Sequence, residues 1–261
     1  MDRTRCLVLA AAGLFAGAAN AQVTLYTQDF ENPTGFVNDG GDVNIFRSVN
    51  QLYGNQPEGF RFGQTNTVET LLIGGSQAWG RGFSDPDGRA GQYTLGMLSS
   101  FQNDFLGLSF NVGSYDFLNF QLDISSIDLD RWSGPFVPDG AVPTFRLSLF
   151  DNPSGASGVG SGSALSFVDV SGIASPNDYT LAWTNVVVGL STAGSTNGNV
   201  TLRIDMLDGG YGALDNFVIV ASDVPGEIPG TPPIPEPQTW ALLAVGLAAL
   251  AWTRRRRSDH A

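Results

Sequence analysis

The sequence contains very few of the residues that most often act as nucleophiles, general bases or metal ligands. Among 261 residues there are one cysteine, one histidine and no lysine. Cys6 lies near the start of the chain, and His260 is the last residue but one. A domain between them lacks the parts of a disulfide framework, a zinc-thiolate site, a serine or cysteine triad and a Schiff base. We therefore expect a protein that is not an enzyme.

Positive charge is scarce as well. Between residues 22 and 253 the chain carries seven arginines against 23 aspartates and glutamates. Such a surface repels nucleic acid, whose phosphates need basic side chains, so the expected partners are cations, neutral sugars or basic proteins. Carboxylates alone can hydrolyse glycosidic bonds, and a carboxylate-dependent glycoside hydrolase therefore stays open as an alternative.

Residues 1–21 have the pattern of a secretory signal peptide. Two arginines stand within the first five residues, an apolar run extends from Cys6 to Ala18, and Ala-Asn-Ala precedes Gln22. A charged start, an apolar centre and a small-residue cleavage site are typical of such signals. The sequence predicts export, and cleavage before Gln22 would leave a mature chain without cysteine.

The other end of the chain has a proline-rich segment, a short apolar segment and a basic cluster. Six prolines lie between Pro225 and Pro237, and residues 240–252 carry no charge and have a tryptophan at each end. Thirteen residues span about 20 Å as a helix, which is short for a bilayer core of about 30 Å and would suit a buried helix. The flanking tryptophans and the four arginines that follow favour a marginal membrane anchor, with the arginines on the cytoplasmic side.

These three parts, in this order at the chain end, resemble the PEP-CTERM sorting signal of exported bacterial proteins. The matching residues are Pro235, Glu236 and Pro237, the apolar segment, and Arg254, Arg255, Arg256 and Arg257. The resemblance implies that a membrane-embedded enzyme, exosortase, recognises the Pro-Glu-Pro and removes the tail, so that contact with the membrane through residues 239–253 is transient. It also implies a cell-surface or extracellular location in a Gram-negative bacterium that makes exopolysaccharide.

The segment between these two ends reads as one all-β domain over residues 22–222. Four stretches alternate between apolar and polar residues over most of their length, as strands covered on one face do. They are FLGLSFNV, FLNFQLDIS, TFRLSLF and NVTLRIDM. Six further apolar stretches separated by turn residues bring the count to about ten strands, and we find no convincing helix. We predict an antiparallel two-sheet β-sandwich, jelly-roll-like, with residues 154–163 as a flexible loop.

The two ends of this domain resemble, more weakly, jelly-roll carbohydrate-binding and lectin-like domains. The resemblance rests on Asp-Phe-Glu at residues 29–31, which we expect to end the first strand, and on ALDNFVIV, which we expect to open the last. It implies that these strands lie side by side and that Glu31 and Asp215, with Asp29 as a lesser candidate, bind a structural Ca²⁺. In the alternative reading Asp215 and Asn216 merely begin the strand through side-chain bonds to the backbone.

Two glycine-bearing segments place tryptophan beside arginine. Trp79 and Arg81 lie in Trp-Gly-Arg-Gly-Phe, and Trp132 follows an arginine in the second segment. Exposed tryptophans flanked by hydrogen-bonding groups stack on sugar rings, whereas buried ones would close the end of the sandwich. Both readings stay open, so Trp79, Arg81 and Trp132 are candidate glycan-binding residues.

The sequence thus predicts four regions: a signal peptide (1–21), a β-sandwich (22–222), a proline-rich linker with the Pro-Glu-Pro motif (223–237) and a sorting helix with a basic tail (238–261). We expect an exported, non-catalytic surface or matrix protein whose partners are exosortase and, for the domain, a polysaccharide. A purely structural or adhesive module without a small ligand is the competing expectation.

Overall fold

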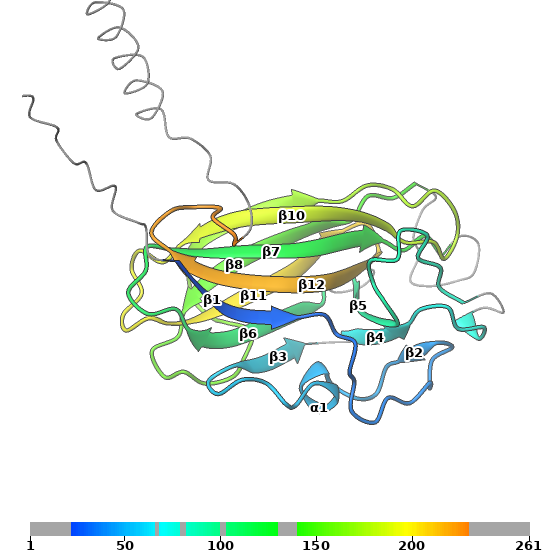
Figure 1. Cartoon of the computed structure of the whole chain (residues 1–261), viewed down its shortest axis with the longest axis horizontal. Helices are drawn as coiled ribbons and strands as arrows, with labels where there is room; N and C mark the ends of the chain where they lie inside the picture. The colour runs from blue at the N-terminus through cyan, green and yellow to red at the C-terminus, as the bar shows by residue number, and fades with distance from the viewer. Residues whose placement is uncertain (1–21, 66–67, 79–81, 100–102, 130–139, 230–261) are drawn as a thin grey trace, which may run out of the picture.

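The protein is an all-β sandwich of two antiparallel sheets, as the alternating segments predict (Figure 1). The computed structural model describes residues 22–65, 68–78, 82–99, 103–129 and 140–229. The predicted signal peptide, the Pro-Glu-Pro motif, the apolar tail segment and the terminal arginines lie outside these residues. In the described part of the chain no helix is long and apolar enough to cross a membrane.

The larger sheet has seven strands and the smaller has five. The larger sheet runs in the order β10-β7-β12-β5-β4-β2, with β1 also paired to β12. Its strands are β1 (Gln22–Gln28), β2 (Val43–Asn44), β4 (Glu69–Leu72), β5 (Tyr93–Leu98), β7 (Phe117–Ser126), β10 (Ala182–Ser191) and β12 (Tyr211–Ser222). The smaller sheet has the order β3-β6-β11-β8-β9. Its strands are β3 (Arg61–Thr65), β6 (Phe105–Asn111), β8 (Thr144–Asp151), β9 (Ala164–Ser171) and β11 (Asn199–Asp208).

The main core lies between the two sheets, where the apolar residues of each alternating segment meet. Phe120 of β7 and Phe217 of β12 pack edge to face with ring centroids 5.1 Å apart, and both side chains are buried. Leu108 of β6 and Leu202 of β11 face them from the smaller sheet. The polar residues of the same segments consequently lie on the outer faces of the sheets.

One short helix, α1 (Val49–Leu52), is not predicted by the sequence pattern. Ser48 and Gln51 form a capping box around its first turn, and Val49 and Leu52 are buried in the main core. Four residues are too few to show a helical period in the sequence, so this turn cannot be recognised from periodicity.

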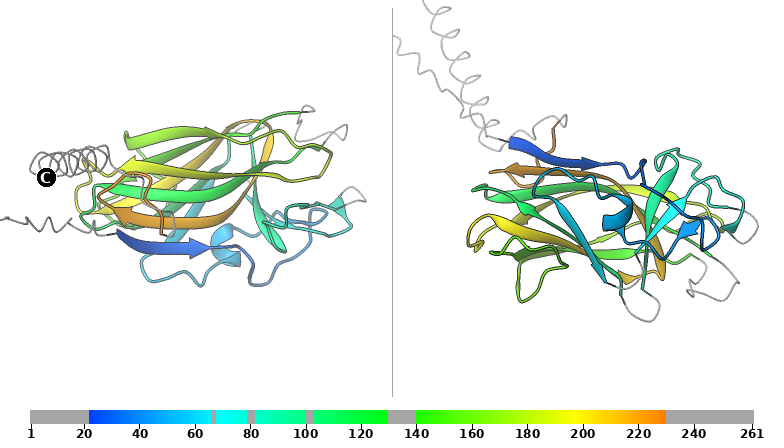
Figure 2. Two further views of the ribbon diagram at one scale, coloured as in Figure 1. Left: turned by 45° about the horizontal axis from the view of Figure 1, so that its top comes forward. Right: turned by 90° about the horizontal axis from the view of Figure 1, so that it is seen from below.

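A second apolar cluster covers part of the outer face of the larger sheet. Tyr211 and Ala213 of β12 pack there against Phe83, Tyr179 and other residues from the connecting loops. The connecting segments 30–42 and 82–92 lie at the end of the sandwich away from the start of β1, as the two views of Figure 2 show. Beyond this cluster the outer face carries polar residues such as Gln121, Asp123 and Asn185, together with Val218.

The glycine-rich segment 154–163 is a loop, as predicted, and its middle part, residues 158–160, lies against the outer face of the smaller sheet. A Cβ atom built on Gly63 or Gly107 would lie within 3 Å of the Gly158 backbone. The absence of side chains on β3 and β6 at these two positions therefore allows the loop backbone to lie directly on the sheet.

The first and last strands lie side by side, as the jelly-roll resemblance implies. β1 pairs with β12 from Gln22 opposite Ser222 to Gln28 opposite Phe217. The expected strand limits are wrong: β1 ends at Gln28, before Asp29, and β12 begins at Tyr211, so that Asp215 lies well inside it. Residues 223–229 continue from β12 and remain in contact with the domain, with Ile228 buried.

Candidate functional site

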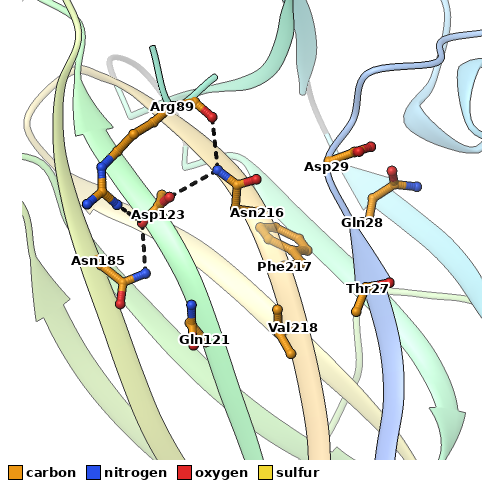
Figure 3. A pocket seen from close by; sticks show the side chains of 10 residues that line it. All are labelled: Thr27, Gln28, Asp29, Arg89, Gln121, Asp123, Asn185, Asn216, Phe217 and Val218. Carbon is orange, nitrogen blue, oxygen red and sulfur yellow. Dashed lines mark hydrogen bonds and ion pairs between the residues drawn. The ribbon is translucent and has the colours of Figure 1, made fainter. Parts of the chain in front are cut away.

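A polar hollow of about 430 Å³ lies on the outer face of the larger sheet (Figure 3). Four strands and one loop form it. The lining residues are Thr27, Gln28 and Asp29 from β1 and the residue after it, Arg89 from the β4–β5 connection, Gln121 and Asp123 from β7, Asn185 from β10, and Asn216, Phe217 and Val218 from β12. Gln121 and Asp123 face outward because Phe120, Leu122 and Ile124 alternate with them and fill the core.

Asp123 is the centre of a hydrogen-bond network along one side of the hollow. Its Oδ1 accepts from Arg89 Nη1 at 2.9 Å and from Asn185 Nδ2 at 2.8 Å, and its Oδ2 accepts from Asn216 Nδ2 at 3.0 Å. Asn216 Nδ2 also donates to the Arg89 carbonyl at 3.0 Å. The Asp123 side chain is 5% exposed and that of Arg89 is 45% exposed. The carboxylate therefore holds three donors in place, while the guanidinium remains open to solvent.

A β-bulge in β12 brings Asn216 into this network. Asp215 pairs with Asp123 and Val218 pairs with Gln121, so one extra residue is inserted in β12 between these two pairs. Asn216 adopts a φ of 52°, a left-handed conformation that asparagine tolerates better than most residues. The bulge turns the Asn216 side chain toward Asp123 and still leaves Phe217 in the core.

The carboxylates predicted to bind Ca²⁺ lie near a gap in the larger sheet beside the hollow. On one side, β12 pairs with β5 up to Leu214 and with β1 from Phe217 onward. Asp215 therefore lies at the point where the strand beside β12 changes from β5 to β1. Asp215 is fully buried, and its Oδ1 accepts from the Asn216 N–H at 2.6 Å. Its Oδ2 has no hydrogen-bond partner among the described residues, since the neighbouring Thr94 hydroxyl donates to the Leu214 carbonyl at 2.8 Å. Burial is the main cause that raises the pKa of Asp215 to about 9; the charges of Glu31 and Asp123 act in the same direction, and the hydrogen bond from the Asn216 N–H acts against it.

Glu31 connects the end of β1 to the start of β5. Its two oxygens accept from the Gln92 N–H at 3.0 and 2.9 Å, and one of them also accepts from the Tyr93 N–H at 3.2 Å. Gly91 leaves room for this carboxylate, since a Cβ atom there would lie 2.4 Å from Glu31 Oε1. Asp29 is exposed, and its Oδ1 accepts from the Glu31 N–H at 3.2 Å.

The partnerless oxygen of Asp215 is the observation that fits a cation here. Ca²⁺ takes six to eight oxygen ligands, so Asp215 and Glu31 would need backbone carbonyls and water to complete the set. Within residues 22–229, apart from the stretches that are not described, no group of three or more acidic, histidine or cysteine side chains is arranged to hold a metal ion. The calcium site therefore remains a prediction supported by one buried oxygen.

The candidate glycan-binding residues Trp79, Arg81 and Trp132 lie outside the described residues, and their role also remains a prediction. The hollow residues that the sequence does not mark as a site include Asp123 and four further polar residues: Arg89, Gln121, Asn185 and Asn216. The alternative in which Asn216 helps to begin the last strand is wrong, because β12 begins at Tyr211. The outward position of Gln121 is predictable from its alternation in β7, but the convergence of the four residues is not.

Comparison with known proteins identifies the tail. Residues 233–257 match the PEP-CTERM protein-sorting motif, which confirms the resemblance of the C-terminal segment. This motif indicates an exosortase-processed protein that reaches the cell surface through a membrane-anchored precursor. No curated protein matches the chain at a significant level.

Several solved structures are similar to the chain at low sequence identity. The K3 cleaved adhesin domain of Lys-gingipain from Porphyromonas gingivalis is 14% identical, covers 77% of this chain and 99% of its own, and has a TM-score of 0.39. A xylan-binding domain from CBM 22 is 13% identical, covers 77% of this chain and 96% of its own, and has a TM-score of 0.40. A cyclase from Fischerella sp. TAU is 14% identical, covers 80% of this chain and 100% of its own, and has a TM-score of 0.43.

Proposed function

We propose that the domain is a non-catalytic surface module that binds a neutral saccharide in the polar hollow of the larger sheet. The observation that carries this proposal is the hydrogen-bond network around Asp123, which holds Arg89, Asn185 and Asn216 in defined positions on a solvent-open surface. Binding sites need such preorganised polar groups, because side chains that are already held lose little entropy when a ligand arrives.

The groups that remain available in the hollow suit the hydroxyls of a sugar. Asn185 donates to Asp123 through its nitrogen, which leaves its amide oxygen as an acceptor. Gln121 offers both a donor and an acceptor beside it, and Arg89 keeps further N–H groups after its bond to Asp123. Neighbouring sugar hydroxyls both donate and accept, so amide side chains pair with them well. Val218 adds an apolar surface between these polar groups.

The sorting motif supports a function outside the cell. A protein that is exported and processed by exosortase meets the polysaccharides of the envelope and the extracellular matrix. We infer that the ligand is an extracellular polysaccharide of a Gram-negative bacterium, and that the acidic domain would bind neutral chains in preference to acidic ones.

The carboxylates of the hollow favour binding over hydrolysis. A glycosidase needs one carboxylic acid and one carboxylate that both face the scissile bond. Asp123 is nearly buried and is occupied by three donors, and Asp215 lies beneath the surface with no exposed area. Asp29 is the lining carboxylate that remains exposed. An enzyme of the carboxylate type would have to use Asp29 together with Asp123, and this pair forms the competing proposal.

We further propose that Asp215 and Glu31 hold a structural Ca²⁺ beside the hollow. A bound cation would neutralise the buried carboxylate and would link β12 to the segment after β1. Glu31 already ties that segment to β5 through the Gln92 and Tyr93 N–H groups. Asn216 follows Asp215 directly, so this arrangement would also steady the residue that donates to Asp123.

A glycan array with the purified exported form tests the binding proposal. We expect specific binding that is lost in both Asn185→Ala and Gln121→Ala, and retained in Asn50→Ala, an exposed asparagine on α1 that serves as the matched control. A blank array would refute the proposal and favour a purely structural or adhesive module. Release of sugar from a bound glycan, lost in Asp29→Asn, would instead establish the hydrolase.

A further inference from the structure

The segment after the last strand is held against the domain by one buried asparagine. We name residues 223–229 the C-terminal clasp. Asn119 of β7 donates from its Nδ2 to the carbonyls of Val224, at 2.9 Å, and Glu227, at 3.1 Å, and its Oδ1 accepts from the Gly226 N–H at 2.7 Å. Asn119 itself has no exposed area. A fully buried amide that makes three bonds to one turn holds that turn firmly.

Further contacts support the clasp. The Ser222 hydroxyl donates to the Glu227 carboxylate and accepts from the Val224 N–H. The turn lies so close to β10 that a Cβ atom on Gly189 would be 2.8 Å from the Gly226 nitrogen. Ile228 is 4% exposed. The chain therefore remains attached to the domain until about Pro229, seven residues beyond the end of β12.

The clasp lies at the end of the sandwich where the mature chain would also begin. Gln22 pairs with Ser222, so both ends of the domain leave from one place (Figure 1). The exposed residues Asp116 and Asp223 lie there as well, and the Asp116 N–H donates to Asp223 Oδ1 at 3.3 Å. A neutral or basic surface is the kind of partner that this acidic end fits.

The clasp limits how far the sorting motif can be from the folded domain. Six residue steps separate Pro229 from Pro235, and a fully extended chain spans at most about 3.5 Å per residue, or about 21 Å here. Without the clasp, thirteen steps from Ser222 would allow about 45 Å. The twelve residues of β12 alone extend over about 40 Å. The clasped domain is thus longer than the tether that connects it to the motif.

We propose that the clasp holds the Pro-Glu-Pro motif so close to the domain that the processing enzyme contacts the clasp end of the sandwich when the motif enters its active site. Asn119 is then a positioning residue for processing, although it lies far from the motif in the sequence. The hollow is lined by Thr27, Gln28 and Asp29 at the other end of β1, so it lies away from the clasp. In this proposal the clasp end of the sandwich is the end that faces the membrane before the tail is removed. This inference depends on the sorting motif and is independent of any glycan.

Shortening the tether tests the proposal in the full chain, expressed in cells that contain an exosortase. Deletion of residues 230–232 keeps the matched motif and reduces the reach from Pro229 to about 11 Å. We expect the processed form to be lost and the precursor to accumulate. Adding Gly226→Val to the deletion should restore processing. Valine disfavours the φ of 74° at that position, so the clasp should open, and the chain between the domain and the motif would then begin nearer Ser222 and span a greater distance. Asn119→Ala should also restore it.

A protease assay and a melting curve show whether a variant opens the clasp without unfolding the sandwich. Opening of the clasp is detected by an endoproteinase that cuts after glutamate: Glu227 should be protected in the parent chain and cut in Gly226→Val, while the melting transition of the sandwich stays in place. Asn50→Ala in the deletion background is the control and should not restore processing. Normal processing of the deletion variant would overturn the proposal, and so would a block that neither clasp variant relieves, since that would point to the motif's local sequence.

Discussion

Replacement of Asp215 by asparagine tests the central electrostatic feature of the structure. The substitution keeps the shape of the side chain and its acceptor for the Asn216 N–H, and it replaces the ionisable oxygen by an amide group that stays neutral at every pH. Burial raises the pKa of this carboxyl from its ordinary value of 3.8 to about 9. At pH 7 the folded protein must therefore keep Asp215 protonated, whereas the unfolded chain ionises it freely.

The size of the effect follows from this difference in pKa. Below about pH 4 the carboxyl is protonated in both the folded and the unfolded chain, so it does not lower the free energy of unfolding. As the pH rises from 4 toward 9 the unfolded chain loses this proton more readily than the folded protein, and the free energy of unfolding falls. Between pH 4 and pH 7 the loss is about three pH units at 1.36 kcal/mol each, or about 4 kcal/mol. In the presence of chelator, Asp215→Asn should be about as stable as the parent at pH 4 and about 4 kcal/mol more stable at pH 7.

Urea unfolding at several pH values measures this difference directly. Asp87→Asn, which changes an exposed aspartate, is the matched control and should not show the trend. If Ca²⁺ binds, adding it should stabilise the parent, by about 2.7 kcal/mol at a hundred times its Kd, and should leave Asp215→Asn unchanged. An Asp215→Asn variant whose advantage does not grow between pH 4 and pH 7 in chelator would refute the reasoning, because the buried oxygen would then have a partner such as ordered water.

Three further predictions concern the framework, each measured by chemical denaturation. Burial raises the pKa of Glu69 to about 7, so Glu69→Gln, which still accepts the Tyr211 hydroxyl, should stabilise the protein by about 3 kcal/mol above pH 7 and by little at pH 4; equal effects at both pH values would contradict this. Gly107→Ala should cost about 1–3 kcal/mol, because its Cβ would lie 2.1 Å from the Gly158 carbonyl oxygen, whereas Gly158→Ala, whose Cβ meets nothing within 4 Å, should be nearly neutral. Phe120→Ala should cost about 3–5 kcal/mol, since the ring is fully buried, and a smaller loss would mean that the core collapses around the vacancy.

The two sheets could be predicted because their information is local. In FLNFQLDIS every second residue is apolar, and the structure places Leu118, Phe120 and Leu122 in the core and Gln121 outside it. The scarcity of cysteine, histidine and lysine can also be seen in the sequence without knowledge of the fold. The tail was equally local, since its proline motif, apolar segment and arginines occur within one continuous stretch that matches the sorting motif.

The glycine-rich loop and the helix α1 show what local patterns do not reveal. The composition of residues 154–163 predicts a loop, but it does not predict that Gly158 lies against the smaller sheet, because the space for it is left by Gly63 and Gly107 on another part of the chain. The helix has a capping box and two buried residues, but it is shorter than the window in which a helical period can be detected.

The sequence alone therefore determined the class of fold, the export of the protein and the processing of its tail, because each depends on the order of neighbouring residues. Tertiary structure decided the rest. The hollow joins residues near positions 28, 89, 122, 185 and 217, which meet only because β1, β7 and β10 are arranged around β12. The burial of Asp215 and the reach of the clasp depend on the same long-range pairing, and side-chain alternation within a strand carries no information about which strand will lie beside it.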